Sequence, residues 1–264
     1  MIKIGITGGK GLLGLLLKKK LKKEKIKISS FNGNIKSKVQ IKKWLNLNPN
    51  IDYIFHLAAV SSPKEVNKDK IDAFEVNVKG TLNIINIIEE KKKKILMFFP
   101  SSSHVYKYSK KKIKENFIKK PSSYYGKTKL AAEKLIKKKK SKYLSFFIGR
   151  IFSVYHIKQK KPFLFPSVKE KIALNRKNKL FIKNGYCVRD FINAEEVVEI
   201  LFKIYIKKIT GIFNIGSGKG LTVKSFVQKE FNIQNLASSD RIKNSLVSNN
   251  NKLKLKLKQS NAKI

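Results

Sequence analysis

The chain has 264 residues, of which 42% are hydrophobic, so it is long enough to bury a substantial core and wholesale disorder is not expected. Its single cysteine, Cys187, excludes an intramolecular disulfide scaffold, and no uncharged apolar run approaches the roughly 18 residues that cross a bilayer. The formal charge of +43 reflects 60 basic against 17 acidic residues. The basic residues are nearly all lysines spread along the chain, which favours a solvated basic surface over a dedicated nucleic-acid site.

The first residues lead directly into an apolar strand pattern and lack the features of a signal peptide. We therefore expect a cytoplasmic protein with no membrane partner and no specific nucleic-acid partner. The excess of lysine should still attract anionic substrates and cause salt-sensitive, non-specific binding.

Strand-like runs alternate with helix-like stretches, which predicts βαβ units and a doubly wound parallel sheet of about seven strands. We expect strands at 2–7, 26–29, 53–58, 95–99 and 143–148, and helices at 12–23, 39–47, 73–90 and 123–138. Residues 190–215 return to a helix and then a strand. The tail from about residue 243 alternates Lys and Leu and fits an edge strand, a short helix or disorder.

The domain organisation follows from these elements. The fold class is α/β: a Rossmann doubly wound parallel sheet with a small C-terminal substrate domain. We place the NAD(P)-binding Rossmann domain at 1–155, rejoined by about 188–216. The pattern loosens through Pro162 and Pro166, so 156–187 and 217–264 are assigned to the small substrate-binding region.

A glycine-rich loop lies between the first strand and the first helix. Gly8, Gly11 and Gly14 allow a tight turn, a close approach of the backbone to a pyrophosphate, and close packing of the helix on the sheet. The helix N-terminus then offers N–H groups to the phosphates. The loop therefore predicts a dinucleotide site, to which Lys10, Leu12 and Leu13 also belong.

The second strand lacks the carboxylate that usually binds the ribose 2′-hydroxyl of NAD. Ser29 and Ser30 stand there instead, with Lys36 and Lys38 nearby. Hydroxyls and ammonium groups suit a 2′-phosphate better, so the pattern favours NADP over NAD as the cofactor.

Serines 101–103 follow an apolar strand and therefore lie at the sheet edge where open α/β sheets bind ligands. Tyr125 and Lys129 are four residues apart and share one face of a predicted helix. A nearby ammonium group and an oxidised nicotinamide ring would both lower the tyrosine pKa from about 10. Tyr125 could then exchange a proton with a sugar oxygen while a serine hydroxyl orients that oxygen.

Taken in order, several motifs resemble the signatures of the extended short-chain dehydrogenase/reductases, the NAD-dependent epimerase/dehydratase family. They are Thr7 to Gly14, Phe55 to Ala59, Asn77 to Thr81, the serine run, Tyr125 to Lys129, Arg189 to Ile192, and Asn214 to Gly218. The resemblance covers roughly residues 1–225. It implies a Rossmann domain, a small substrate domain and chemistry on a nucleotide-sugar substrate.

The resemblance also implies roles for single residues. Ser102, Tyr125 and Lys129 would form the catalytic triad. On the cofactor side, Asn34 would accept from adenine, next to Ile35, while Leu57, Ala58 and Ala59 line the site and Asn77 supports it. The substrate-side residues would be Ser61, Ser62, Ser103, His104, Ser153 and Arg189, and no metal ligand is expected. Arg189 could bind a diphosphate or pair with Asp190, and these alternatives stay open.

Departures from the family pattern narrow the reaction. Sugar 4,6-dehydratases carry Asp-Glu where this chain has Ser103-His104, so dehydration is not expected. The short segment before the His-Leu-Ala-Ala strand resembles the 4-keto-sugar reductases, and an NAD-dependent C4 epimerase is the close alternative. The alternative from another class is a non-catalytic Rossmann-fold binding protein. The presence of all three triad residues argues against it. Such enzymes commonly pair through two helices, so a homodimer is an open option by analogy.

Overall fold

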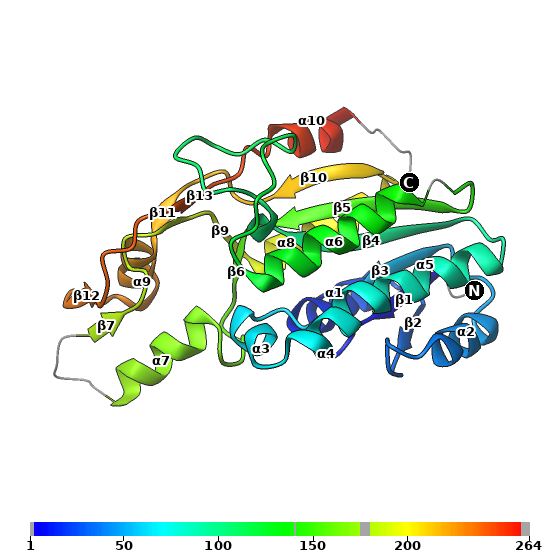
Figure 1. Cartoon of the computed structure of the whole chain (residues 1–264), viewed down its shortest axis with the longest axis horizontal. Coiled ribbons are helices and arrows are strands. Elements are labelled where there is room, and N and C mark those ends of the chain that lie inside the picture. Colours follow the sequence, from blue (N-terminus) through cyan, green and yellow to red (C-terminus); the bar gives the residue numbers. More distant parts are fainter. Residues whose placement is uncertain (1–2, 140, 175–179, 260–264) are drawn as a thin grey trace.

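The computed structural model describes residues 3–139, 141–174 and 180–259. The start of the expected first strand, residues 175–179 of the small region and the end of the tail therefore lie outside the described residues. Its main feature is a sheet of six parallel strands (Figure 1). In spatial order these are β10 (Gly211–Ile215), β5 (Leu144–Ile151), β4 (Ile95–Ser102), β3 (Tyr53–His56), β1 (Ile4–Thr7) and β2 (Ile28–Phe31). The Rossmann α/β class is confirmed, with six strands in place of the roughly seven expected.

The direction in which the sheet grows reverses at β1. The chain adds β2 on one side of β1 and then β3, β4 and β5 on the other. Thr7, at the end of β1, lies opposite His56 of β3 and Phe31 of β2. The carboxyl ends of β1 and β3 therefore meet at a topological switch point, where open α/β sheets bind their ligands.

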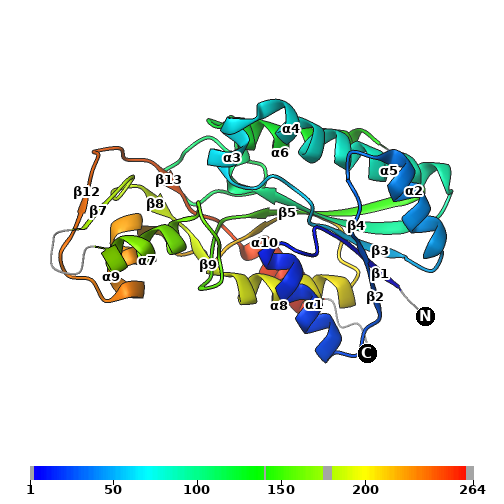
Figure 2. The same cartoon turned by 90° about the horizontal axis from the view of Figure 1, so that it is seen from below.

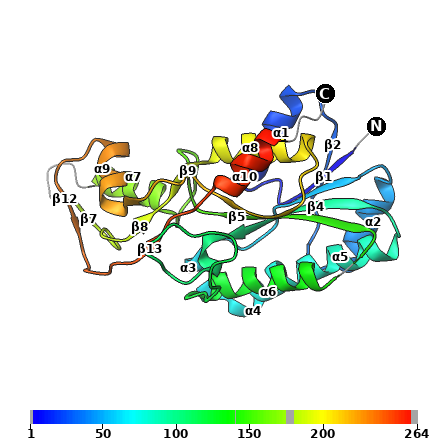
Figure 3. The same cartoon turned by 90° about the horizontal axis from the view of Figure 1, so that it is seen from above.

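Helices cover both faces of the sheet (Figures 2 and 3). One face carries α1 (Leu12–Lys23) and α8 (Ala194–Ile206), and the other carries α2 (Lys38–Leu47), α5 (Gly80–Glu90) and α6 (Tyr124–Lys138). In α1 the leucines 17 and 21 are fully buried while most of its lysines face solvent, which is the amphipathic pattern of a helix packed on a sheet. The lysine runs are thus a solvated surface here.

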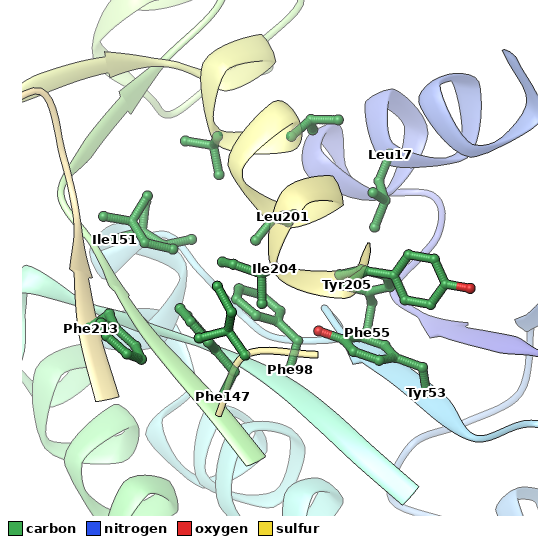
Figure 4. Packing of buried hydrophobic residues seen from close by; sticks show 14 of the residues in the cluster. Leu17, Tyr53, Phe55, Phe98, Phe147, Ile151, Leu201, Ile204, Tyr205 and Phe213 are labelled. Carbon is green, nitrogen blue, oxygen red and sulfur yellow. The ribbon is translucent and has the colours of Figure 1, made fainter. Parts of the chain in front are cut away.

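Aromatic rings fill the space between the sheet and α8 (Figure 4). Phe98 and Phe147 come from adjacent strands with ring centroids 5.7 Å apart, and Phe213 stacks on Phe147 at 4.9 Å. Burying one such side chain contributes about 1.5–3 kcal/mol. These contacts hold the central strands rigidly, so the residues at their carboxyl ends have fixed positions.

A smaller region lies beyond the carboxyl ends of the strands, at the left of Figure 1. Its main elements are α7 (Leu164–Leu174), β7 (Leu180–Ile182), α9 (Val223–Phe231) and β12 (Leu236–Ser238). They enclose a separate apolar cluster that includes Phe226 and the fully buried Cys187. The small region thus faces the sheet edge where the switch point lies.

The Lys/Leu stretch of the tail adopts the helical alternative among the three expected, after a two-residue strand, β13 (Ser245–Leu246). Helix α10 (Asn251–Gln259) packs against β10, and Lys252 Nζ donates to the carbonyl of Ile212 at 2.9 Å. It covers an edge strand whose backbone would otherwise be open to solvent. Within the described ranges, no helix has both the length and the apolar character that a bilayer span requires.

The second strand lies two residues later than predicted, at 28–31 in place of 26–29. The reason is the end of α1, where Lys25 adopts a left-handed conformation with φ of 55° and Ile26 N–H donates back to the carbonyl of Leu21 at 2.9 Å. This helix-capping arrangement uses the residues that the pattern had assigned to the strand. The strand therefore ends at Phe31 and not at the serines.

Candidate active site

The glycine loop lies at the switch point and depends on its glycines in different ways. Gly8 has φ of +68°, and a Cβ there would lie 2.5 Å from the backbone N of Ala58. A Cβ on Gly14 would lie 2.5 Å from the carbonyl O of Gly8, whereas a Cβ on Gly11 meets only that same oxygen, at 3.4 Å. A side chain at Gly8 or Gly14 would therefore clash with the protein's own backbone, whereas the space next to Gly11 is open.

The N-terminus of α1 is also free for a ligand. Gly11 occupies the capping position, no side chain caps this end, and the first turn contains no acid. By contrast, Ser37, Ser123 and Asn193 cap α2, α6 and α8. The first N–H groups of a helix need acceptors, and a pyrophosphate supplies them. The loop and the helix therefore fit the dinucleotide predicted for Lys10, Leu12 and Leu13, of which Lys10 is exposed and the leucines are half-buried.

The structure changes the expected role of the lysines near the second strand. Lys36 pairs with Asp72 at 2.7 Å, and Lys38 pairs with Glu90. The Ser29 hydroxyl accepts a hydrogen bond from Trp44 Nε1 at 2.8 Å, because alternate strand residues face opposite sides of the sheet. Of the groups predicted to favour a 2′-phosphate, only the half-buried Ser30 faces the glycine loop, with its Oγ 3.4 Å from where a Gly9 Cβ would stand.

The adenine-side residues lie after β2. Asn34 is exposed, and its side-chain oxygen accepts from Lys36 N at 2.9 Å, so the predicted acceptor is already used within its own turn. Ile35 is buried and lies close to Gly80, at the start of α5. Asn34 and Ile35 therefore shape this turn, and a direct contact with adenine stays a prediction.

Buried polar contacts fix the segment after β3. His56 is held between the hydroxyls of Thr7 at 2.8 Å and Thr81 at 3.0 Å. Burial, followed by repulsion from Lys129, lowers the pKa of His56 to about 3, so its ring is neutral. Its role is to connect β1, β3 and α5 at the switch point.

The half-buried residues Leu57, Ala58 and Ala59 follow His56 at the same edge. Asn77 lies in a π-helical turn (Glu75–Lys79) and exchanges hydrogen bonds with the backbone N–H of Val60 at 2.9 Å and its carbonyl at 3.0 Å. It also donates to Thr128 Oγ1 of α6 at 3.1 Å. Asn77 thus ties this cofactor-side loop to the helix that carries Tyr125, and such π-turns are frequent at functional sites.

The structure brings Ser102, Tyr125 and Lys129 together at the end of β4. Ser102 is the last residue of the strand, and its side chain lies close enough to the Tyr125 hydroxyl to oppose the rise of that tyrosine's pKa. Lys129 is only 2% exposed, with Nζ 5.9 Å from the centroid of the Tyr125 ring and 5.0 Å from that of Phe99. A tyrosine with a hydroxyl and a buried ammonium group close to it is an arrangement that can exchange a proton with a bound oxygen.

The pKa values of this group differ from the expectation. Burial raises the pKa of Tyr125 to about 12, against the opposing hydrogen bond from Ser102. Burial also lowers the pKa of Lys129 to about 8, against the attraction of Glu133. In the protein alone, desolvation thus outweighs any effect of the lysine on the tyrosine. A lowered tyrosine pKa requires the additional positive charge of an oxidised nicotinamide.

Of the residues predicted to face the substrate, Ser103, His104 and Arg189 lie next to this group. Ser103 and His104 begin a short 3-10 turn (Ser103–Val105), and the His104 ring meets the Tyr125 ring edge-on with centroids 5.8 Å apart. Burial, followed by repulsion from Arg189, lowers the pKa of His104 to about 4. A neutral imidazole therefore lies beside Tyr125, with Arg189 close enough to disfavour its protonation.

Arg189 and Asp190 form no ion pair, which removes the ion-pair alternative that the sequence left open for Arg189. This carboxylate is fully buried and accepts from Ser217 N at 2.7 Å and from Gly218 N and Ser248 N at 3.0 Å. Arg189 instead donates to the carbonyls of Val188 and Asn244. Asp190 therefore holds three chain segments together, and diphosphate binding by Arg189 stays a prediction.

The remaining substrate-side predictions have mixed surroundings. Ser62 is buried and caps α3 (Pro63–Lys68) by accepting from Glu65 N, while Ser61 beside it is exposed. Ser153 is half-buried in β6 (Ser153–Tyr155), and its backbone N–H donates to the carbonyl of Asp190 at 2.9 Å. A structural role accounts for Ser62, whereas Ser61 and Ser153 keep their side chains available.

The sequence analysis missed a buried network behind the triad. Glu133 and Arg150 form a bidentate ion pair, with distances of 2.9 Å and 2.7 Å, and both are at most 1% exposed. Ser101 Oγ donates to Glu133 at 2.5 Å, and Arg150 Nη1 donates to Tyr106 OH at 2.8 Å. Glu133 lies one helical turn after Lys129 on α6, and this spacing was the signal that could have identified it.

Comparisons with known proteins agree with this geometry. The family model described as "NAD dependent epimerase/dehydratase family" matches residues 4–216. A UDP-glucose 4-epimerase of Mycoplasma pneumoniae is 27% identical over 198 residues, covering 66% of this chain and 58% of that protein. A GDP-6-deoxy-D-mannose reductase of Pseudomonas aeruginosa is 24% identical over 186 residues, covering 67% of this chain and 61% of that protein. The chain thus spans less than two thirds of the length of these relatives.

Solved structures share the fold. The UDP-glucose 4-epimerase of Thermus thermophilus, solved in complex with NAD, superposes with a TM-score of 0.83 at 19% identity, covering 100% of this chain and 95% of that one. At this identity the likeness establishes the architecture alone.

Proposed function

Because the chain belongs to the NAD-dependent epimerase/dehydratase family, we propose that it is an NAD(P)-dependent oxidoreductase acting on a nucleotide-activated sugar. The reaction that we favour is the reduction of a 4-keto sugar. The observation that supports this proposal best is the grouping of Ser102, Tyr125 and buried Lys129 at the carboxyl end of the sheet, where the uncapped glycine loop also lies.

Each residue has a defined task in this reaction. A bound nicotinamide dinucleotide would supply the hydride that a carbonyl carbon accepts. Ser102 orients the carbonyl oxygen by a hydrogen bond, and Tyr125 gives that oxygen its proton. Lys129, held within 5.9 Å of the tyrosine ring, stabilises the negative charge that then develops on Tyr125. Neutral His104 forms one wall of the sugar site and is no proton donor at neutral pH.

Dehydration is not proposed, because Ser103 and His104 stand where an acid and a base would be needed. Reduction is favoured over epimerisation because no carboxylate follows β2 and a single helix, α2, connects β2 to β3. Epimerisation is the second candidate, since relatives named UDP-glucose 4-epimerase match the chain. Both reactions use the same triad.

The state of the purified protein separates these candidates. An epimerase oxidises and re-reduces its substrate, so it should retain NAD and convert a UDP-hexose to its C4 epimer without added dinucleotide. A reductase should be purified without bound nucleotide and consume NADPH when supplied with a nucleotide-linked 4-keto sugar. Absorbance of the released nucleotide and chromatography of the products distinguish the two. A protein that binds no dinucleotide and shows neither activity would support the non-catalytic alternative.

A further inference from the structure

Two polar groups converge on the backbone of Gly9, inside the glycine loop. A Cβ built on Gly9 would lie 3.4 Å from Ser30 Oγ and 3.6 Å from Lys18 Nζ. Ser30 belongs to β2, whereas Lys18 lies on α1, and its half-buried side chain extends back toward the loop. A hydroxyl and an ammonium group from separate elements thus meet beside the loop that fits a pyrophosphate.

Among the described residues, neither group has a partner that would account for this position. Lys18 forms no ion pair there, whereas nearby Lys20 binds Glu24 at 3.0 Å and Glu199 at 2.9 Å. The hydroxyl of Ser29 is used by Trp44, but that of Ser30 has no hydrogen bond to any described residue. Since Lys36 and Lys38 are both paired with carboxylates, Lys18 is the cation available next to β2.

We infer that Lys18 and Ser30 form the site for the 2′-phosphate of NADP and make the enzyme selective for NADP over NAD. The inference rests on the proposed function, because it concerns the dinucleotide of that same reaction. In a Rossmann unit the adenosine ribose lies between the glycine loop and the end of the second strand, and a cation there accommodates a 2′-phosphate. Lys18 is a residue of α1 and not of the segment after β2, which is where the sequence analysis looked for cations.

The charge of the ligand explains why this pair discriminates. A 2′-phosphate is a strong acceptor with about two negative charges, and it replaces a neutral hydroxyl. Charge-assisted hydrogen bonds from an ammonium group are about twice as strong as neutral ones. No described carboxylate lies within ion-pair distance of Lys18, so the phosphate would not have to displace a competing acid.

The test measures dissociation constants for NADPH and NADH by nicotinamide fluorescence, in wild type and in Lys18→Gln. Loss of one charge-assisted bond should weaken NADPH binding by about 10-fold or more and leave NADH binding nearly unchanged. Lys19→Gln is the matched control, since that lysine is the exposed neighbour on the same helix. Lys36→Gln tests the alternative cation and should change neither constant, because this lysine is bound to Asp72.

A second variant changes the strand side of the site. Ser30→Asp places a carboxylate beside Lys18, so it should weaken NADPH binding and strengthen NADH binding. Two fragments serve as further probes. The affinity for adenosine 2′,5′-bisphosphate should change in the same direction as that for NADPH, and the affinity for adenosine 5′-monophosphate in the same direction as that for NADH.

Three outcomes would overturn the inference: equal affinity for the two dinucleotides in wild type, an equal loss of both in Lys18→Gln, or a selective loss in Lys36→Gln alone. A wild-type protein that binds neither dinucleotide would contradict the proposed function as well. The failure of each claim is therefore recognised separately.

Discussion

Lys129 is buried next to the tyrosine that it would assist, and burial lowers its pKa to about 8. The lysine is therefore protonated below about pH 8 and loses its charge above that pH. An uncharged amine cannot stabilise the anionic tyrosine formed when Tyr125 gives up its proton. The residue is thus poised to titrate close to neutral pH, as catalytic groups commonly do.

This position predicts the pH dependence of the reduction. For wild type, kcat/KM should fall as the pH rises through about 8, because this profile reports ionisations of the free enzyme. Lys129→Met should reduce kcat/KM and remove this ionisation from the profile. Lys127→Met changes an exposed lysine on the same helix and should leave the profile intact. An identical ionisation in Lys129→Met would show that another group titrates.

Glu133 predicts an effect on stability. Glu133→Gln leaves the Arg150 guanidinium buried without a counter-charge, and removing one partner of a buried pair typically costs about 3–5 kcal/mol. Urea unfolding should show a loss of that order. Glu196→Gln, an acid on the exposed side of α8, should change the free energy of unfolding by about 0.5 kcal/mol or less. A small change in Glu133→Gln would mean that the pair adds little to the fold.

At the scale of elements, the glycine loop predicts two different phenotypes. Gly8→Ala forces a left-handed residue against the backbone of Ala58, so it should lower stability by at least about 1–3 kcal/mol. Gly11→Ala meets only one oxygen at 3.4 Å, so it should cost only about 1 kcal/mol, because Ala is a poorer N-cap than Gly. Its methyl group would nevertheless stand over the free amides of α1 and weaken dinucleotide binding.

Thermal unfolding with fluorescence titration of both variants checks this contrast. If Gly11→Ala binds the dinucleotide as tightly as wild type does, the pyrophosphate does not bind at the N-terminus of α1.

The elements also show what the sequence could and could not predict. Helix α1 has the predicted bounds, because its leucines recur at helical spacing after a glycine loop. The shift of β2 was not predictable, because α1 ends at left-handed Lys25 where a glycine would normally signal the end. The triad was predictable because strand, turn and helix follow one another along the chain. Lys18 was not, because its proximity to Ser30 depends on tertiary packing.

For the whole molecule, buried histidines predict a loss of stability in acid. The pKa values of His56 and His104 are lowered to about 3 and about 4, so the unfolded chain binds protons below pH 6.5 that the folded protein does not. Stability should therefore fall as the pH decreases from about 6.5 to 4, by up to about 1.4 kcal/mol per pH unit for each histidine. Urea unfolding as a function of pH measures this slope.

His104→Gln provides the internal test of that slope. It removes one of the two groups, so the dependence of stability on pH over this range should be reduced and not abolished. A pH dependence equal to that of wild type would show that His104 is protonated in the folded protein.

The central claim is that this chain reduces the sugar of a nucleotide-linked substrate through Tyr125, and deuterium transfer tests it most directly. NADPH carrying deuterium at the transferable C4 position is incubated with nucleotide-linked 4-keto sugars, and mass spectrometry detects the label in the product. Wild type should place one deuterium on the sugar. Tyr125→Phe, which keeps the ring and its packing, should bind the dinucleotide and transfer the label about 10²–10⁴ times more slowly. A wild type that binds NADPH but labels no sugar, or a Tyr125→Phe enzyme at full rate, would contradict the account.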